Sequence, residues 1–250
     1  MNLAATAHLL FEWTKRDFRI RYTQTLLGSM WALIQPIALT AAFVFLFRRV
    51  AGIDVGIPYA SFVFSGMLVW TLFSAGVSNA NSAMLGSMHV AAKANYPRVV
   101  APLSGALLPL VDLAAGLVLL PILFVVQDPP ARLLPLQFLA AAIGTLLLSS
   151  GLGTLLAALT VFVRDIRNIV PLAMQLFLLV TPVGYASPRL PDWLRHNPMA
   201  TFVEGFRSSV LDVPGPPLSR WLTAFAISVL MFVLGLWYFH RVERRFPDVA

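Results

Sequence analysis

Six long apolar runs dominate this sequence and limit what it can fold into. A helix that crosses a membrane needs roughly 20 consecutive, mostly apolar residues, and each run approaches or exceeds that length. The chain is 58% hydrophobic and 12% charged, whereas a soluble domain carries about 25% charged residues. We therefore expect an all-α integral membrane protein with six transmembrane helices in a single domain over residues 1–250. The expected spans are about 29–47, 59–78, 99–126, 135–163, 169–186 and 221–240.

Basic residues near the ends of these runs predict the orientation. Lys and Arg together number 18, against 11 Asp and Glu. In a soluble chain this excess would indicate nucleic acid, but in a membrane protein it usually lies in cytoplasmic loops and contacts lipid headgroups. With a cytoplasmic N-terminus, more of these residues flank the cytoplasmic ends of the spans, so we expect both termini there. Arg48 and Arg49 are the main exception, because they follow the first span on the other side.

Residues 8–24 form a basic, aromatic-rich segment ahead of the first span. Projected at 100° per residue, the charged and apolar residues separate: Glu12, Lys15, Arg16 and Arg19 against Leu9, Leu10, Trp13 and Ile20. A helix of this kind is suited to lying in the headgroup plane of a membrane. A simple basic flank to the first span is the alternative.

Three connectors between the spans carry further signals. Residues 79–98 are polar enough to leave the membrane, yet apolar enough to pack on another surface, and residues 164–168 read RDIRN. Both could dock on a soluble partner or be ordinary connecting loops. Residues 187–220, on the opposite side, contain six prolines around short apolar stretches. One stretch, Met199–Leu211, has the length of a re-entrant or interfacial helix. This loop could shape an outer vestibule or be a folded cap without a gating role.

The sequence lacks the residues of the common catalytic and metal sites. Neither of its two lysines, Lys15 and Lys93, follows the glycines of a P-loop, so ATP hydrolysis by that mechanism is excluded. Cysteine is absent, and the histidines lack metal-site spacing. We therefore expect no catalytic residue, no metal and no bound cofactor. Asp112 is the one acidic residue within a span, and it could be a helix–helix contact, a channel contact or a packing aspartate. Proton-coupled transport would usually require more than one such residue.

Polar and aromatic side chains within the spans could line a path for a hydroxylated cargo. Gln35 lies beside Pro36, and aromatic residues are frequent along the first two spans. Polar side chains can equally hydrogen-bond across helices, and aromatic residues also form belts at membrane interfaces. These residues therefore permit a sugar path without establishing one.

Several motifs resemble one family. The segment LLFEWTKRDFRIRYTQTLLGSMWALIQP, residues 9–36, is similar to the opening of permeases in polysaccharide and polyol-phosphate ABC exporters. The matching positions are Lys15, Arg16, Asp17, Phe18, Arg21, Tyr22, Thr25, Leu27, Gly28, Trp31 and Pro36. The resemblance continues in order through Tyr96-Pro97-Arg98, Val163–Ile166, Thr181–Tyr185, Leu190-Pro191, Asn197-Pro198 and Phe206-Arg207. The O-antigen and teichoic-acid branch is more similar than the capsule branch. Gly184 departs from the family, in which many members carry a bulkier residue.

This resemblance implies a homodimer in the bacterial inner membrane, surrounded by membrane lipids. It also implies two copies of a separate cytosolic ABC ATPase subunit, which would hold ATP and Mg, and a lipid-linked, O-antigen-like polysaccharide as cargo. On the interface helix, the candidate residues for the cargo headgroup are Lys15, Arg16, Arg19 and Arg21. The first and fifth spans would line the conduit, with candidates Trp31, Gln35, Phe43, Phe177 and Tyr185. Contact with the ATPase would involve residues 86–98 and the 164–168 turn, with candidates His89, Lys93, Tyr96, Arg98, Arg164, Asp165 and Arg167.

Other functions remain open on the sequence. An ABC exporter permease for teichoic acid, capsule, lipid or drug would share the same partner and topology. A membrane-embedded glycolipid enzyme would need clustered acidic or histidine residues, which the chain lacks. A membrane scaffold that transports nothing would leave glycan export unchanged when it is deleted.

Overall fold

The computed structural model describes residues 3–23, 30–50, 52, 54–91, 97–186, 194 and 196–248. Its helices are α1 (Leu3–Thr23), α2 (Trp31–Phe43), which continues as the π-helix η2 (Val44–Val50), α3 (Tyr59–Ala91), α4 (Val100–Leu107), α5 (Leu110–Gln127), α6 (Pro135–Phe162), α7 (Ile166–Val180), α9 (Pro198–Val210) and α10 (Leu218–Val242), followed by the 3-10 turn η4 (Glu243–Asp248). Within these residues the only strand-like pairing is an isolated bridge between Ala131 and Leu211.

The helices confirm the all-α membrane fold. Five helical stretches are long and apolar enough to cross a membrane: Leu33–Val50, Tyr59–Met84, Val100–Gln127, Pro135–Phe162 and Leu218–Phe246. The fifth expected span, about 169–186, corresponds to α7, which has 15 residues and is apolar but shorter than a typical span. Each expected span therefore has a helix in the structure.

The largest difference from the predicted helix boundaries is at the end of the second span. The second span was expected to end near Ser78, but α3 continues to Ala91. The connector 79–98 is therefore helical over its first half. The third expected span is long enough to tilt or to be broken by Pro109, and the structure shows the break: α4 ends at Leu107 and α5 begins after Pro109, which has no N–H to continue the hydrogen-bond ladder.

Local sequence explains several helix ends. The helix α5 stops at Asp128, which adopts a left-handed conformation with φ 47°, and two prolines follow it. The short helix α9 begins with Asn197, whose side chain accepts a hydrogen bond from the Met199 N–H at 2.9 Å. Pro198 occupies the first helical position, where a missing N–H costs nothing. The predicted apolar stretch 199–211 is thus a helix, and most of its side chains are buried.

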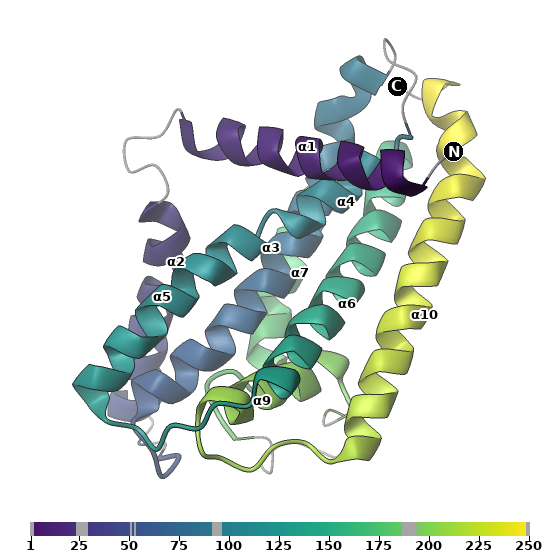
Figure 1. Ribbon diagram of the computed structural model, residues 1–250. Coiled ribbons are helices and arrows are strands. Elements are labelled where there is room, and N and C mark those ends of the chain that lie inside the picture. The colour runs from purple at the N-terminus through teal and green to yellow at the C-terminus, as the bar shows by residue number, and fades with distance from the viewer. Residues whose placement is uncertain are drawn as a thin grey trace.

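The long helices form a bundle, and α1 lies across one end of it (Figure 1). We call this the α1 end and the opposite one the far end. The C-terminal part of α10 also lies at the α1 end, whereas α9 is folded against the far end. Helices α3 and α6 share the most extensive packing, α10 packs on α6, and α2 and α5 lie on the other side of α3. The two described termini therefore lie at the same end, as an even number of crossings requires.

Small residues let the central helices approach closely. A Cβ placed on Gly153 of α6 would lie 2.6 Å from the Ala80 Cβ of α3, and a Cβ on Gly235 of α10 would overlap the Gly151 carbonyl of α6. Contacts of this kind replace the hydrophobic driving force that lipid removes between membrane helices. The small residues Ser149 and Gly153, four positions apart on α6, form a pattern that allows such close approach.

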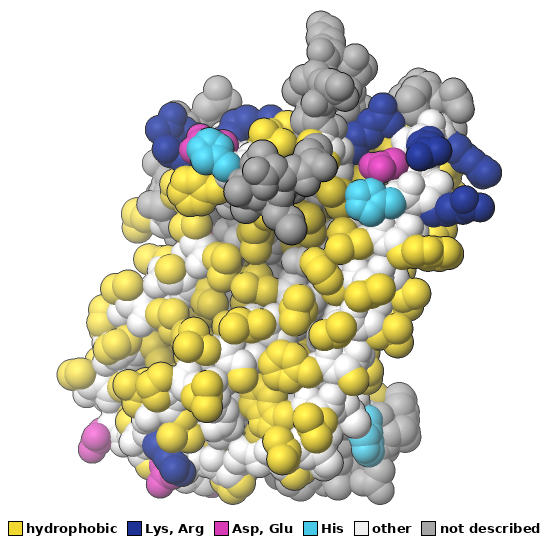
Figure 2. All heavy atoms as spheres, turned by 45° about the vertical axis from the view of Figure 1, so that its right-hand side comes forward, with side chains coloured by type: hydrophobic (Ala, Val, Ile, Leu, Met, Phe, Trp, Pro, Cys, Tyr) yellow, Lys and Arg dark blue, Asp and Glu magenta, His cyan; other side chains and the backbone are white. Residues whose placement is uncertain are grey.

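The surface is divided into zones (Figure 2). Hydrophobic side chains cover the middle of the visible face, and charged side chains gather at its two ends, with most of the basic ones at the α1 end. Large apolar side chains on α10 are more than half exposed, among them Leu222, Val233 and Trp237. An exposed apolar belt between two charged rims matches a chain whose middle lies in lipid.

Candidate functional site

The helix α1 packs on the bundle through one tryptophan. Trp13 is 9% exposed and lies with Leu9 and Leu10 against Val100 and Ala101 of α4. The predicted apolar side of this helix is therefore used for packing over its first half. Ile20, which the helical projection placed on the same side, is instead 66% exposed. An exposed apolar side chain at this end suits a helix in the interfacial region.

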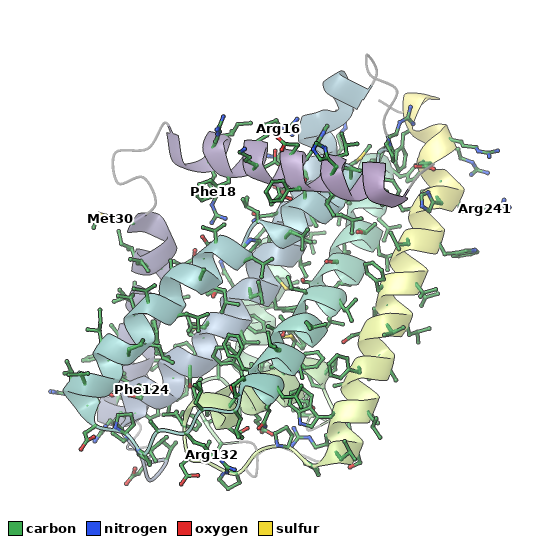
Figure 3. The ribbon with its side chains drawn as sticks, viewed as in Figure 1. Arg16, Phe18, Met30, Phe124, Arg132 and Arg241 are labelled. Carbon is green, nitrogen blue, oxygen red and sulfur yellow. The ribbon has the colours of Figure 1, made fainter. Side chains whose placement is uncertain are left out.

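Among the basic candidates on α1, Arg16 and Arg21 each form an ion pair. Arg16 pairs with Asp17 at 2.8 Å, and its guanidinium lies 3.9 Å from the centre of the Trp13 ring. Arg21 pairs with Asp112 of α5 at 3.2 Å. Lys15 and Arg19, like Arg16, are exposed. In Figure 3, Arg16 on α1 and Arg241 near the end of α10 lie at the same end of the bundle, and Arg132 lies at the opposite end.

Asp112 therefore holds α1 against the bundle. Its carboxylate is 13% exposed and faces the Arg21 guanidinium. A second link joins α1 to α4, since the Ser104 hydroxyl donates to the Asp17 carboxylate at 2.9 Å. The sequence singled out Asp112 as an embedded acid, and the structure assigns it to a helix–helix contact. Because Arg21 supplies the other half of this contact, its charge is largely committed within the chain.

A hollow of about 470 Å³ lies beside α1, between α1, α3 and α4. Arg16, Asp17 and Arg21 line it from α1, and Asn79 lines it from α3. The Asn79 side-chain nitrogen is buried and has no hydrogen-bond partner among the described residues. Sequence reasoning placed Asn79 in a loop and missed it, because only the continuation of α3 carries it beneath α1. The hollow thus combines cationic groups with an amide donor.

The conduit candidates differ in their exposure. Gln35 on α2 is exposed, whereas Phe43 is 9% exposed and packs on Gly184. Phe177 of α7 lies with its ring centre 5.8 Å from that of Trp70. Tyr185 donates its hydroxyl to the Leu179 carbonyl at 2.9 Å. The side chain of the fifth candidate, Trp31, lies outside the described residues. A lining role for these residues stays a prediction.

The described candidates for ATPase contact lie at the α1 end. Arg164, Asp165 and Arg167 are exposed in the turn from α6 to α7. Arg98 is half-buried and donates to the Glu243 carbonyl of η4 at 2.6 Å, so it joins the start of α4 to the C-terminal turn. The side chains of His89, Lys93 and Tyr96 lie outside the described residues. The exposed turn is therefore the described part of this candidate surface.

Comparison with known proteins decides the family. The family model of the ABC-2 type transporter matches residues 8–211. The chain belongs to the ABC-2 type transporter family. It is 26% identical over 254 residues to an O-antigen export system permease protein RfbA of Klebsiella pneumoniae. This alignment covers 99% of this chain and 97% of the relative. A second such Klebsiella pneumoniae permease is 26% identical over 257 residues, with the same two coverages. An O-antigen export system permease protein RfbA of Myxococcus xanthus is 25% identical over 230 residues, covering 89% of this chain and 88% of the relative.

The ABC-2 match runs from α1 through α9 and so includes every candidate described above. It also includes a buried arginine that sequence reasoning placed in the loop opposite the N-terminus. Arg207 of α9 is 3% exposed, and its guanidinium lies 3.5 Å from the centre of the Phe62 ring. Its Nε donates to the Phe62 carbonyl at 3.1 Å, and its Nη2 donates to the carbonyls of Pro182 and Val183 at 3.2 and 2.8 Å.

These bonds fix the turn that follows α7 in this ABC-2 type transporter. The next carbonyl, that of Gly184, accepts a hydrogen bond from the Tyr59 hydroxyl at 2.6 Å. Arg207 and Tyr59 therefore satisfy three consecutive carbonyls at the far end. The Phe206-Arg207 pair was part of the family resemblance, and it was the signal that could have marked this arginine as structural. Its acceptors lie far away in the sequence, so the pattern itself does not show them.

Proposed function

We propose that this chain is the membrane permease of an ABC exporter that moves a lipid-linked, O-antigen-like polysaccharide across the bacterial inner membrane. The observation that carries the proposal is the similarity over nearly the whole chain to permeases named for O-antigen export. A separate ATPase subunit, in two copies, drives transport and holds ATP and Mg. Both termini face the cytoplasm in this proposal, so the α1 end is the cytoplasmic end.

The conduit forms between two copies of the chain. Support comes from α7, where Ile169, Leu172, Leu176 and Leu179 are each more than half exposed although the helix is too short to span the membrane comfortably. Gln175 is exposed on the same helix. An apolar surface with a polar side chain suits both a subunit contact and a path for sugars. In this arrangement α2 and α7 of both copies enclose the polymer.

The cargo headgroup binds at α1. A diphosphate is attracted by Lys15, Arg16 and Arg19, which are exposed on this helix, and charge-assisted hydrogen bonds to phosphate are among the stronger ones. The hollow beside α1 adds the side-chain nitrogen of Asn79, which has no hydrogen-bond partner in the part of the chain that the structure describes. Arg21 acts indirectly by pairing with Asp112, so we assign it a positioning role.

ATP-driven closure of the two ATPase subunits pushes on the exposed 164–168 turn and on residues 86–98. The turn leads directly into α7, so a displacement there is passed to the helix that borders the conduit. Arg98 holds the C-terminal turn through Glu243, so the same displacement also reaches the end of α10.

The partner is tested by purifying the tagged permease from its native membrane in mild detergent and measuring the complex by native mass spectrometry. Two copies of this chain with two copies of a P-loop ATPase are expected. Recovery without any ATPase in several detergents would contradict the proposal and favour an embedded enzyme or a scaffold.

The headgroup role has a separate test. Lys15→Gln combined with Arg19→Gln is expected to abolish surface polysaccharide and leave the complex assembled. Arg244→Gln combined with Arg245→Gln removes the same charge from η4 at the same end and serves as the matched control. Normal export by the α1 variant would contradict headgroup binding at α1.

A further inference from the structure

A groove lies on the outer side of the bundle, away from the hollow beside α1. It has a volume of about 510 Å³ and runs between α2 with η2, the start of α3 and the end of α5. This volume is within the range of small-molecule sites, roughly 300–1,000 Å³. Its walls are almost entirely apolar: Ile37, Ala41, Val44, Phe45, Phe64, Leu119, Ile122 and Val126 are among the residues that line it. One charged residue, Arg49, lines it as well.

The groove has the length of one leaflet of a membrane. From Ile37 to Arg49 the helix advances roughly 18 Å at about 1.5 Å per residue. Half of a hydrocarbon core about 30 Å thick is roughly 15 Å. Arg49 lies near Ala60 and Val126, where α3 begins and α5 ends, and so marks the far end of the groove. An acyl chain of a lipid in one leaflet would lie along the groove, with the lipid headgroup beside Arg49.

The charge at the mouth selects an anionic headgroup. Arg48 and Arg49 are both exposed, and no ion pair within the described parts of the chain involves either of them. Their position also conflicts with the charge rule that predicts the orientation of the chain, because basic residues are unfavoured beyond the first span on this side. A phosphate partner for these residues accounts for that exception.

We propose that this groove is a binding site for one anionic phospholipid, with an acyl chain between α2, α3 and α5 and its phosphate on Arg49. A polar cargo is excluded by the apolar walls. The site does not depend on what the permease exports, because its evidence is the shape, length and charge of the groove.

The test uses two pairs of neighbouring residues. Ala41 lines the groove and Ala42 does not, and both are exposed on α2. In the same way Arg49 lines the groove and its exposed neighbour Arg48 does not. Ala41→Phe fills the groove, Arg49→Gln removes the headgroup partner, and Ala42→Phe and Arg48→Gln are the matched controls.

The full-length protein is purified in detergent and titrated with dioleoyl phosphatidylglycerol or dioleoyl phosphatidylcholine, and bound lipid is counted by native mass spectrometry. We expect one tightly retained phosphatidylglycerol per chain. Arg49→Gln should weaken its binding about five-fold, the factor that corresponds to about 1 kcal/mol for one cation near a lipid phosphate. Ala41→Phe should abolish the tightly bound lipid, and both controls should retain it.

Three outcomes would overturn the proposal. Equal losses for Arg48→Gln and Arg49→Gln would indicate unspecific attraction of anionic lipid. If the Ala41→Phe variant were a monomer where the unaltered protein is a dimer, and still bound the lipid, a second copy of the chain would be the occupant of the groove. Co-purification of a polyisoprenyl diphosphate at this site, in place of a phospholipid, would assign the groove to the cargo. This experiment measures lipid binding and not export. The lipid site can therefore be confirmed when the proposed function fails, and the proposed function can be confirmed when the lipid site fails.

Discussion

Replacing Arg207 by methionine should destabilise the far end strongly. Methionine fills much of the same space but donates no hydrogen bond. The Phe62 carbonyl would still accept from the Ser65 hydroxyl at 3.0 Å, whereas the carbonyls of Pro182 and Val183 have no other donor among the described residues. Leaving a buried acceptor unsatisfied costs about 1–3 kcal/mol. Two such carbonyls give an expected loss of about 4 kcal/mol in the free energy of unfolding.

Equilibrium unfolding in mixed micelles of dodecyl maltoside and sodium dodecyl sulfate measures this loss. Arg132→Met is the matched control, because Arg132 is 59% exposed and lies 4.0 Å from its nearest acidic partner. The Arg132→Met control should change the free energy of unfolding by less than about 0.5 kcal/mol. Arg207→Lys should lower the free energy of unfolding by an amount between those of Arg207→Met and Arg132→Met, since one ammonium cannot reproduce the forked geometry of a guanidinium. A loss below about 1 kcal/mol for Arg207→Met would refute the reasoning that these carbonyls depend on it.

Three further changes have definite expected outcomes. A double-mutant cycle of Arg21→Gln and Asp112→Asn should give a coupling energy of about 1 kcal/mol in the same unfolding assay, because the pair is only partly shielded from solvent; additive effects would mean that the two residues do not interact. Gly235→Leu should prevent stable assembly, seen as aggregation in size-exclusion chromatography, because its Cβ would overlap a carbonyl of α6, whereas Ala226→Leu on the exposed side of α10 should elute normally. Arg167→Glu should reduce co-purified ATPase several-fold without changing the unfolding midpoint, and unchanged recovery would exclude the turn as a contact.

The sequence predicts the spans well, because the length of an apolar run directly reports the thickness of the membrane. It predicts the end of α3 poorly. Residues after Ser78 are polar enough to suggest a loop, yet the helix continues to Ala91, and part of this polar stretch is bonded within the bundle. Thr160 of α6 donates to the Asn81 side chain, for example, so a polar residue in this stretch does not require water.

The candidate site is predictable in type but not in geometry. Charge spacing identified a basic helix and an embedded acid, but it could not show that Arg21 and Asp112 are partners, since they are far apart in the chain. Arg207 was placed within the outer loop 187–220, and its partners could not be predicted for the same reason. Its acceptors come from α3 and from the turn after α7, and only the folded chain brings these carbonyls around one guanidinium.

The two links that hold α1 also have a consequence for how the protein is made. The Ser104 hydroxyl that binds Asp17 lies 87 residues further along the chain. At a synthesis rate of roughly 5–20 residues per second, this partner is made about 4 to 17 s after Asp17. During that interval α1 has neither of its polar partners on the bundle, and the membrane surface is the available support for its apolar side. The helix that is synthesised first among those described therefore waits for its polar contacts until α4 and the start of α5 are made, and a ribosome stalled before α4 would leave it on the lipid.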